Sequence, residues 1–319
     1  MTVKFLLPFL FSFTISIIAI FFLLRTKNTS VKRLGGAVVI AVFVLTVLLN
    51  KDLIITKPIA GILVGGGLIL IFGLWDDLKN IKWQRQLMFQ IIIAIIVISF
   101  GVRSEFIANP FGGFINLTSP VIYFLVFTFY FLVFLNALNW LDGTDGLAGG
   151  VTLASLGTIF FLGLKPEVDQ PATVILAAIA GGAVLGFLIF NFNPARILAG
   201  TSGAWFFGFI LAGLSIFAGA KIATVMMAVL IPILDLARVI LGRYKAGQSI
   251  FQRDKRHFHY LLLEAGVSEK KIFFLYFFAS VLIGILALNL RAAGKIISII
   301  IIVLIYLLSA REVKQWKIK

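Results

Sequence analysis

Residues 172–190, ATVILAAIAGGAVLGFLIF, give the clearest indication of the fold class. This stretch runs for nineteen residues without a charged side chain, and a helix needs about 20 apolar residues to cross the hydrocarbon core of a bilayer. The run is continuous and does not alternate between apolar and polar residues. It therefore predicts a membrane-spanning helix and excludes a strand of a transmembrane β-barrel.

Runs of the same kind recur along the whole chain. We expect an all-α polytopic membrane protein with eleven spanning helices; the alternative is ten, because the second, third and fourth runs are short or contain glycine. We see no repeat, no low-complexity tract and no soluble domain, so residues 1–319 are expected to form one membrane-embedded domain. The expected helices are about 5–24, 34–50, 59–75, 86–101, 120–138, 147–164, 172–190, 203–219, 222–241, 271–290 and 294–310.

The composition agrees with this fold class. Hydrophobic residues make up 61% of the chain and charged residues 13%, whereas a soluble domain is about half apolar and a quarter charged. The net charge of +15 is explained by basic residues on the cytoplasmic side, so we expect no nucleic-acid partner. The absence of cysteine rules out disulfides, thiolate metal sites and a cysteine nucleophile.

The basic residues predict the orientation in the membrane. Only Lys4 precedes the first run, whereas four basic residues follow it between positions 25 and 33, which places the N-terminus outside. With this topology, 20 of the 28 Lys and Arg residues lie inside and 8 outside. We therefore expect a multi-pass protein of the plasma or inner membrane. Its expected cytoplasmic segments are about 25–34, 76–86, 137–147, 191–203, 242–270 and the C-terminal tail 311–319.

Asp76 and Asp77 are adjacent carboxylates at the end of the third run. Two such groups repel each other unless they share a cation or a proton, and Mg²⁺ prefers carboxylate oxygens. The other interpretation is a solvated loop start, balanced by Lys79, Lys82 and Arg85. This motif alone favours neither interpretation.

A second polar segment is more specific. Asn136, Asn139, Asp142 and Asp145 recur every three residues, a spacing that keeps neighbours on one side of a helix. Such a polar stripe at membrane depth is costly and indicates a functional site. A helix N-cap by Asp145 would explain one of these residues but not all four.

His257 and His259 are the only histidines of the chain. Histidines two residues apart point the same way only in an extended segment, and a transition-metal site would lack a nearby third ligand. Their basic surroundings suit phosphate binding; the alternative is a lipid-headgroup patch. Asp235 and Arg238, three residues apart in the ninth run, are expected to form an intramembrane ion pair that neutralises both charges.

Carboxylates with Mg²⁺ and basic loops at the inner face suit an anionic phosphate substrate. Phosphoryl transfer needs mainly positioning and charge neutralisation, and an amphiphilic acceptor would explain the membrane location. No P-loop motif is present. A transporter or flippase is the rival class, but it predicts polar residues near the midplane and repeat symmetry, neither of which we see.

Together these motifs resemble the polyprenyl-phosphate N-acetylhexosamine-1-phosphate transferases, of the glycosyl transferase family 4 type. The resemblance runs from about Arg25 to Ser268, in the order of the family. Its elements are Arg33-Leu-Gly-Gly, Gly73-Leu-Trp-Asp-Asp-Leu, Asn109-Pro-Phe-Gly-Gly, Asn136-Ala-Leu-Asn-Trp-Leu-Asp-Gly-Thr-Asp-Gly-Leu-Ala, Asn191-Phe-Asn-Pro-Ala-Arg, Pro232-Ile-Leu-Asp and Asp254-Lys-Arg-His-Phe-His.

The resemblance implies that a polyprenyl (undecaprenyl) phosphate attacks the sugar-bearing phosphate of a UDP-N-acetylhexosamine and releases UMP. This would be the first membrane step of a cell-envelope glycan, with Mg²⁺ as cofactor and Mn²⁺ as its substitute; a homodimer is also compatible. The segments Lys32-Arg-Leu-Gly-Gly and His257-Phe-His-Tyr260 look more like the GlcNAc-1-phosphate branch. The alternative is the branch that transfers phospho-MurNAc-pentapeptide.

The resemblance also implies roles for individual residues. Asp76 and Asp77 would bind the metal and activate the lipid phosphate. The histidines and nearby arginines would bind the diphosphate or the sugar. The implied catalytic residues are Asp76, Asp77, Asp142, Asp145, His257 and His259. The implied substrate-binding residues are Arg33, Asn136, Asn139, Asn191, Asn193, Arg196, Arg253 and Arg256. The implied metal ligands are Asp77, Asp142 and, in the place of a family aspartate, Thr201.

Three positions depart from the family pattern. Thr201 stands where the family has a metal-binding aspartate, Leu198 replaces an aromatic residue often associated with the uracil, and Tyr260 replaces a common third histidine. A hydroxyl is a weaker ligand for Mg²⁺ than a carboxylate. A catalytically impaired homologue that binds lipid or nucleotide-sugar is therefore the second alternative. The four aspartates that remain favour an active enzyme.

Overall fold

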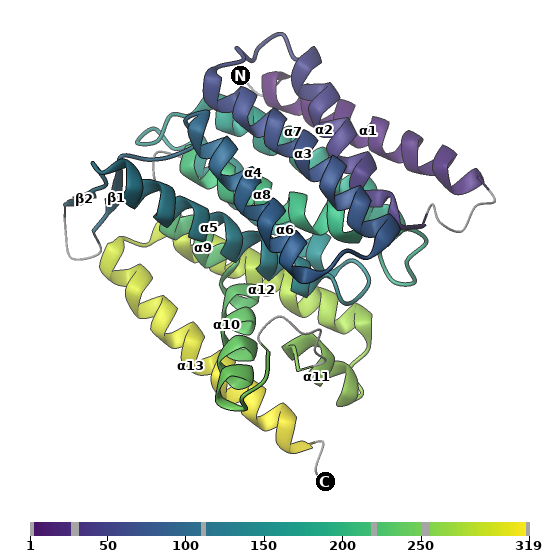
Figure 1. Ribbon diagram of the computed structural model, residues 1–319, viewed down its shortest axis with the longest axis vertical. Coiled ribbons are helices and arrows are strands. Elements are labelled where there is room, and N and C mark those ends of the chain that lie inside the picture. Colours follow the sequence, from purple (N-terminus) through teal and green to yellow (C-terminus); the bar gives the residue numbers. More distant parts are fainter. Residues whose placement is uncertain (1–2, 27–31, 110–112, 218–221, 250–255, 317–319) are drawn as a thin grey trace.

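The structure, a computed structural model, describes residues 3–26, 32–109, 113–217, 222–249 and 256–316. This part of the chain is almost entirely helical (Figure 1). A short antiparallel pair of strands, in which Ile107 lies opposite Ile115, is inserted between two of the helices. The elements are α1 (Val3–Arg25), α2 (Gly35–Leu49), α3 (Lys57–Lys79), α4 (Trp83–Ser99), β1 (Phe106–Ala108), β2 (Phe114–Asn116), α5 (Pro120–Leu141), α6 (Leu147–Gly163), α7 (Pro171–Asn191), α8 (Gly200–Phe217), α9 (Ile222–Ala228), α10 (Leu230–Lys245), α11 (Phe258–Glu264), α12 (Glu269–Asn289) and α13 (Ala292–Trp316).

Within the described residues, seven helices are long and apolar enough to cross a membrane: α1, α3, α5, α7, α8, α12 and α13. The pair α9 and α10 would make an eighth span if it is counted as one. Helices α2, α4 and α6 are also apolar but shorter. The chain is therefore an all-α, multi-pass membrane protein. Each predicted run coincides with one of these helices or with the α9–α10 pair, whereas the count of eleven crossings stays a prediction.

The ninth predicted run, 222–241, is not one continuous helix. The structure divides it into α9 and α10, which meet at an angle of 76°. Pro232 has no N–H to donate to the carbonyl of Ala228, the last residue of α9, and its ring would clash with that carbonyl in a continuous helix. In the first turn of α10, the missing N–H costs nothing. The single-helix prediction was wrong for this reason.

Helices α7 and α8 form the centre of the bundle. In the membrane-spanning stretches of α7 and α8, 89% and 83% of the residues are buried, whereas in that of α13 only 6% are buried. Helix α7 packs against α1 and α6, and α8 packs against α3 and α5 (Figure 1). Helix α13, with the C-terminus, lies at the edge of the molecule (Figure 1).

Small residues let α2 and α3 approach the start of α8 at backbone distance. A Cβ atom added to Gly36 would lie 2.1 Å from the Cα of Gly203, and one added to Gly73 would lie 2.4 Å from the Cα of Ser202. The segment before α2 is also bonded to the segment before α8, because the N–H of Leu198 donates to the carbonyl of Lys32 at 2.6 Å. These contacts place the end of α3 beside the first turn of α8.

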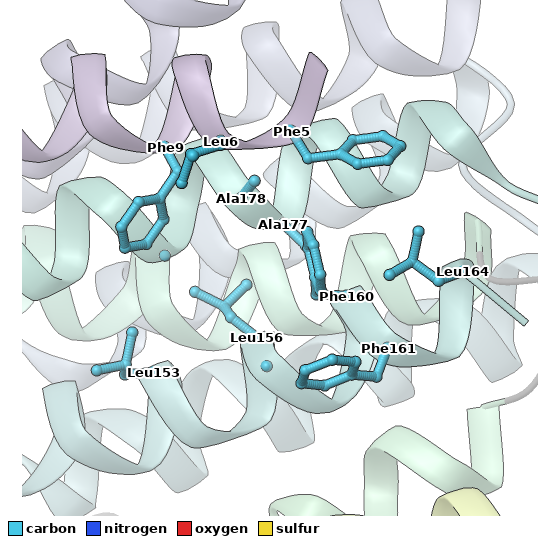
Figure 2. Close-up of a pocket in the computed structure, with 12 residues that line it drawn as sticks. Phe5, Leu6, Phe9, Leu153, Leu156, Phe160, Phe161, Leu164, Ala177 and Ala178 are labelled. Carbon is cyan, nitrogen blue, oxygen red and sulfur yellow. The ribbon is translucent and has the colours of Figure 1, made fainter. Parts of the chain in front are cut away.

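An apolar cavity of about 640 Å³ lies between α1, α6 and α7. Phe5 and Phe9 of α1 line it together with Phe160 and Phe161 of α6 (Figure 2). The two phenylalanines of α6 lie near its C-terminal end, and a helix of this length spans about 25 Å. The cavity therefore lies nearer the end of the bundle that is opposite to the polar loop preceding α6.

Candidate active site

Asp76 is buried at the end of α3. Its Oδ1 accepts hydrogen bonds from the N–H of Ile81 and the Nε2 of Gln86, both at 2.9 Å. Its Oδ2 accepts one from the hydroxyl of Thr201 at 2.5 Å. Both oxygens of this carboxylate therefore already have donors within the chain. Gln86 is a partner that the sequence analysis did not identify.

Asp77 caps the first turn of α8. Its Oδ1 accepts from the N–H of Thr201 at 2.6 Å, and its Oδ2 accepts from the N–H and the hydroxyl of Ser202 at 3.2 and 2.8 Å. A carboxylate at a helix N-terminus satisfies free N–H groups and interacts favourably with the helix dipole. Gly200 has a φ of +69°, and a Cβ there would lie 2.7 Å from both oxygens of Asp77. Only glycine fits between the two segments.

Asp142 directly follows α5 and is half-buried. Its carboxylate accepts no hydrogen bond from the part of the chain that the structure describes. Burial, with a further contribution from the nearby carboxylates of Asp77 and Asp145, raises the pKa of Asp142 to about 7. Asp142 is thus the open carboxylate of the cluster, in surroundings where a cation would relieve the repulsion.

Asp145 ties the loop after α5 to the loop after α7. Its Oδ2 accepts hydrogen bonds from the Nδ2 of Asn193 at 3.1 Å and from the N–H of Ala195 at 2.8 Å. Glu269, the first residue of α12, accepts from the same Asn193 side chain at 3.0 Å and from the N–H of Asp145 at 3.3 Å. Sequence reasoning missed Glu269, which lies 124 residues from Asp145.

The other predicted asparagines differ in their surroundings. Asn191 is buried; its Oδ1 accepts from the N–H of Gly146 at 3.1 Å, and its Nδ2 donates to a carbonyl of its own loop. Asn136 instead pairs with Gln90 of α4, donating to its Oε1 at 2.8 Å. The structure thus places Asn136 in a helix–helix contact. Asn139 is half-buried and has no hydrogen-bond partner among the described residues.

His257 and His259 are both buried, with their rings nearly parallel at 9° and 5.7 Å between centroids. His257 lies before α11 in extended backbone, and its ring lies edge-on to Trp140 at 5.4 Å. Neither ring nitrogen of His259 has a partner among the described residues, and burial lowers the pKa of His259 to about 4. A Cβ atom at Gly143 would lie 2.6 Å from the Nε2 of His259. The histidines therefore pack against the loop that carries Asp142.

The expected ion pair between Asp235 and Arg238 is present at 2.9 Å. Asp235 does more than neutralise this arginine, because it also accepts hydrogen bonds from Tyr306 of α13 and from the N–H of Phe258, and contacts the Nδ1 of His257. The sequence analysis did not anticipate the link to His257 or the contribution of Tyr306.

Three of the predicted arginines belong to the described residues, and their side chains are exposed. Arg33 precedes α2, and its carbonyl lies beside Gly200. Arg196 lies over the ring of Phe190, with the guanidinium carbon 5.0 Å from the ring centroid. Arg256 is also exposed. Arg253 lies outside the described residues.

These side chains fit a Mg²⁺ ion that is shared with a bound substrate. The described residues contain no group of three or more His, Asp or Glu side chains that could hold a metal by themselves. However, Mg²⁺ is commonly held by one or two carboxylates while waters and substrate phosphates complete its octahedron. The open carboxylate of Asp142, with that of Asp77 nearby, offers such hard oxygen ligands.

Several known proteins have sequences similar to that of this chain. The family model described as glycosyl transferase family 4 matches residues 59–219. A probable undecaprenyl-phosphate N-acetylglucosaminyl 1-phosphate transferase of Bacillus subtilis is 28% identical over 290 residues, covering 87% of this chain and 78% of the relative. A decaprenyl-phosphate N-acetylglucosaminephosphotransferase of Mycobacterium leprae is 32% identical over 279 residues, covering 76% and 69%.

A more distant relative represents the second branch. A phospho-N-acetylmuramoyl-pentapeptide-transferase of Lactobacillus acidophilus is 27% identical over 282 residues, covering 82% of this chain and 84% of the relative. The family model extends from α3 to the end of α8 and therefore includes the four aspartates that the structure gathers at one end of the bundle. The resemblance inferred from the motifs is confirmed: the chain belongs to glycosyl transferase family 4.

Proposed function

We propose that this protein transfers N-acetylglucosamine-1-phosphate from UDP-GlcNAc to a membrane polyprenyl phosphate, releasing UMP. The observation that carries the proposal is the acidic cluster of Asp76, Asp77, Asp142 and Asp145, which two separate segments bring to one end of a membrane-embedded bundle. The two relatives named above as GlcNAc-1-phosphate transferases support the donor and the acceptor.

In this reaction, an oxygen of the polyprenyl phosphate attacks the sugar-bearing phosphorus. The bond from that phosphorus to the bridging oxygen breaks, and the oxygen leaves with UMP. Most of the catalytic task is to position and neutralise the phosphates. Asp76 and Asp77 fix the start of α8, since their oxygens accept hydrogen bonds from it. The exposed Arg33 and Arg196 would attract the anionic substrates from the rim.

We further propose Mg²⁺ as the cofactor, held by Asp142 and Asp77, with Mn²⁺ as its substitute. When bound, the ion would neutralise the charge that develops on the transferring phosphates. The hydroxyl of Thr201 donates to Asp76, so this position stabilises a carboxylate and does not add one. We infer from this that the cation depends on substrate phosphates for its remaining ligands. Asp145 and Asn193, bonded to each other, would hold the loop in place.

The site end of the bundle is proposed to face the cytoplasm, with the N-terminus outside and the C-terminus inside. Hydrogen bonds join the expected cytoplasmic segments to one another, for example Lys32 to Leu198 and Asp77 to Thr201. The opposite end contains the strand pair and the ion pair of Lys4 and Asp52 at 3.7 Å. The excess of basic residues on the loops of the site end supports this orientation.

The test is UMP release by the purified protein in detergent with undecaprenyl phosphate and one donor at a time. We expect release with UDP-GlcNAc, dependent on both the lipid and Mg²⁺ and abolished by EDTA. Release with UDP-MurNAc-pentapeptide instead would assign the chain to the branch represented by the Lactobacillus relative. No release with any donor, combined with binding of a UDP-sugar by folded protein, would identify an impaired homologue.

A further inference from the structure

Asp235 is a buried carboxylate with donors on every side. Its Oδ1 accepts three hydrogen bonds, from Tyr306 at 2.8 Å and from Arg238 and the N–H of Phe258 at 2.9 Å each. Its Oδ2 lies 2.7 Å from the Nδ1 of His257. Because three donors occupy Oδ1, the orientation of this carboxylate is fixed, and Oδ2 can point only at the histidine.

The contact with Asp235 decides the state of the His257 ring. An ionised carboxylate only accepts hydrogen bonds, so the Nδ1 of His257 must carry the hydrogen. The lone pair of the neutral ring is then on Nε2. This atom has no hydrogen-bond partner among the described residues, and it is not one of the fully enclosed polar atoms. The ring therefore keeps a proton-accepting atom available.

The ring lies beside the candidate active site. It contacts Trp140, which lies two residues before Asp142, and its neighbour Tyr260 donates a hydrogen bond to the carbonyl of Gly143 at 3.4 Å. Its other titratable or charged neighbours are the ones around Asp235 and Trp140, namely Arg238, Arg243, His259, Tyr276 and Tyr306.

We propose that Asp235 is a positioning residue that holds His257 with its hydrogen on Nδ1, so that Nε2 accepts the proton of a phosphate monoester. In the step, the P–OH proton of the acceptor phosphate moves to Nε2, and the resulting oxyanion attacks. Asp235 then balances the charge of the imidazolium. The identity of the acceptor rests on the proposed function. A phosphate monoester has a second pKa of about 6, so a fraction of it still carries a proton near neutral pH, whereas the diester phosphates of a nucleotide-sugar have none to give.

Asp235→Asn is the decisive substitution. The three donors at Oδ1 would hold the amide oxygen of the asparagine, which turns its NH₂ group toward His257. Since NH₂ only donates, the ring must switch to the tautomer with its hydrogen on Nε2 and lose the available lone pair. Phosphate binding through Nε2–H would persist, but proton acceptance would not.

The first test needs no activity. Because the chain has two histidines, ¹⁵N-histidine labelling gives two ring spin systems in detergent, which His259→Gln assigns. We expect the Nδ1–H tautomer for His257 in the wild-type protein and in Tyr306→Phe, and the Nε2–H tautomer in Asp235→Asn. An Nε2–H ring in the wild-type protein, or the same tautomer in Asp235→Asn, would overturn the proposal. The wild-type spectrum decides even if a variant does not fold.

The second test is UMP release. Loss of a general base typically costs about 100-fold or more, so Asp235→Asn should lower kcat by about that factor while KM for both substrates changes little. Asp52→Asn, the same chemical change at an exposed carboxylate of the opposite end, should keep wild-type kcat. An unchanged kcat in Asp235→Asn would contradict the role. A wild-type protein that releases no UMP would defeat the proposed function but leave the tautomer test standing.

Discussion

At the scale of single residues, the four aspartates of the cluster have different tasks. Asp76, Asp77 and Asp145 each accept hydrogen bonds from other segments, whereas Asp142 has no such donor within the described chain. The hydrogen bonds of Asp76, Asp77 and Asp145 hold segments of the site together, and Asp77 is in addition the proposed second ligand of Mg²⁺. The open carboxylate of Asp142 is the one most available to a cation or a substrate.

We therefore expect Asp142→Asn to lower UMP release by about 100-fold or more, because removal of one charge-stabilising group in an active site costs that much. The melting temperature should not fall, because this side chain donates or accepts no hydrogen bond to another described segment. Its raised pKa of about 7 also shows that the folded protein destabilises the ionised carboxylate. Asp52→Asn is the matched control. Near-normal release by Asp142→Asn would contradict the assignment.

The pKa of Asp142 also predicts how the Mg²⁺ requirement depends on pH. The ionised form binds the cation and the protonated form does not, so binding releases a proton. The pKa of Asp142 is about 7. As the pH is raised toward 7, the Mg²⁺ concentration for half-maximal UMP release should therefore decrease about tenfold per pH unit, and above pH 7 it should become constant. Titrations between pH 5.5 and 8.5 measure this directly. A requirement that does not change with pH would argue against Asp142 as the ligand.

Thr201→Asp should make the fold itself sensitive to Mg²⁺. The hydroxyl of Thr201 donates to Asp76 at 2.5 Å, so an aspartate here would face a like charge unless a cation lies between them. In EDTA, we expect Thr201→Asp to have a lower melting temperature than the wild-type protein. On adding Mg²⁺, its melting temperature should rise by more than that of the wild-type protein. Thr201→Asn, which adds no charge, should show no such shift. If Mg²⁺ raised the melting temperatures of all three proteins equally, the assignment of residue 201 to a position beside the cation would be wrong.

At the scale of elements, the site depends on how closely α3 approaches α8. The contact at Gly73 and Ser202 is backbone against backbone, so neither side can yield without moving a helix. Asp76 and Asp77 follow Gly73 by one turn of α3. Any displacement there would change their hydrogen bonds to the first turn of α8.

Gly73→Ala should therefore lower both stability and activity. Overpacking of this kind costs about 1–3 kcal/mol, which would appear as a lower melting temperature together with reduced UMP release. Gly67→Ala is a matched control on the same helix, because a Cβ there meets no atom within 4 Å. The idea fails if the two variants melt and react alike.

At the scale of the whole molecule, the topology can be tested because the chain has no cysteine. Single cysteines at the exposed Lys51 and Lys82 lie on opposite ends of α3. A membrane-impermeant maleimide should label Lys51→Cys in intact cells, and Lys82→Cys only after permeabilisation. The cysteine-free parent controls for background. The reverse labelling pattern would invert the proposed orientation.

The fold class and the candidate residues could be predicted from the sequence. Long apolar runs specify helices in a membrane because every backbone polar group must be bonded within its own segment, and this signal is local. The motif around Asp142 and Asp145 could also be recognised in the sequence, because regularly spaced polar residues at membrane depth are costly and indicate a functional site. Local signals failed at Val229, because Pro232 breaks the ninth run, which the sequence predicts as a single helix.

Which residues contact one another could be learned from the folded structure alone. Asp76 and Thr201 are 125 residues apart, and Asp235 and Tyr306 are 71 apart, so no spacing rule connects them. Their pairing follows from helix packing, which glycines such as Gly36 and Gly73 set by letting backbones touch. The same packing gives Asn136 a partner on α4 and leaves Asp142 open. Hydrophobicity is a property of a segment, whereas a hydrogen-bond partner is a property of the assembled bundle.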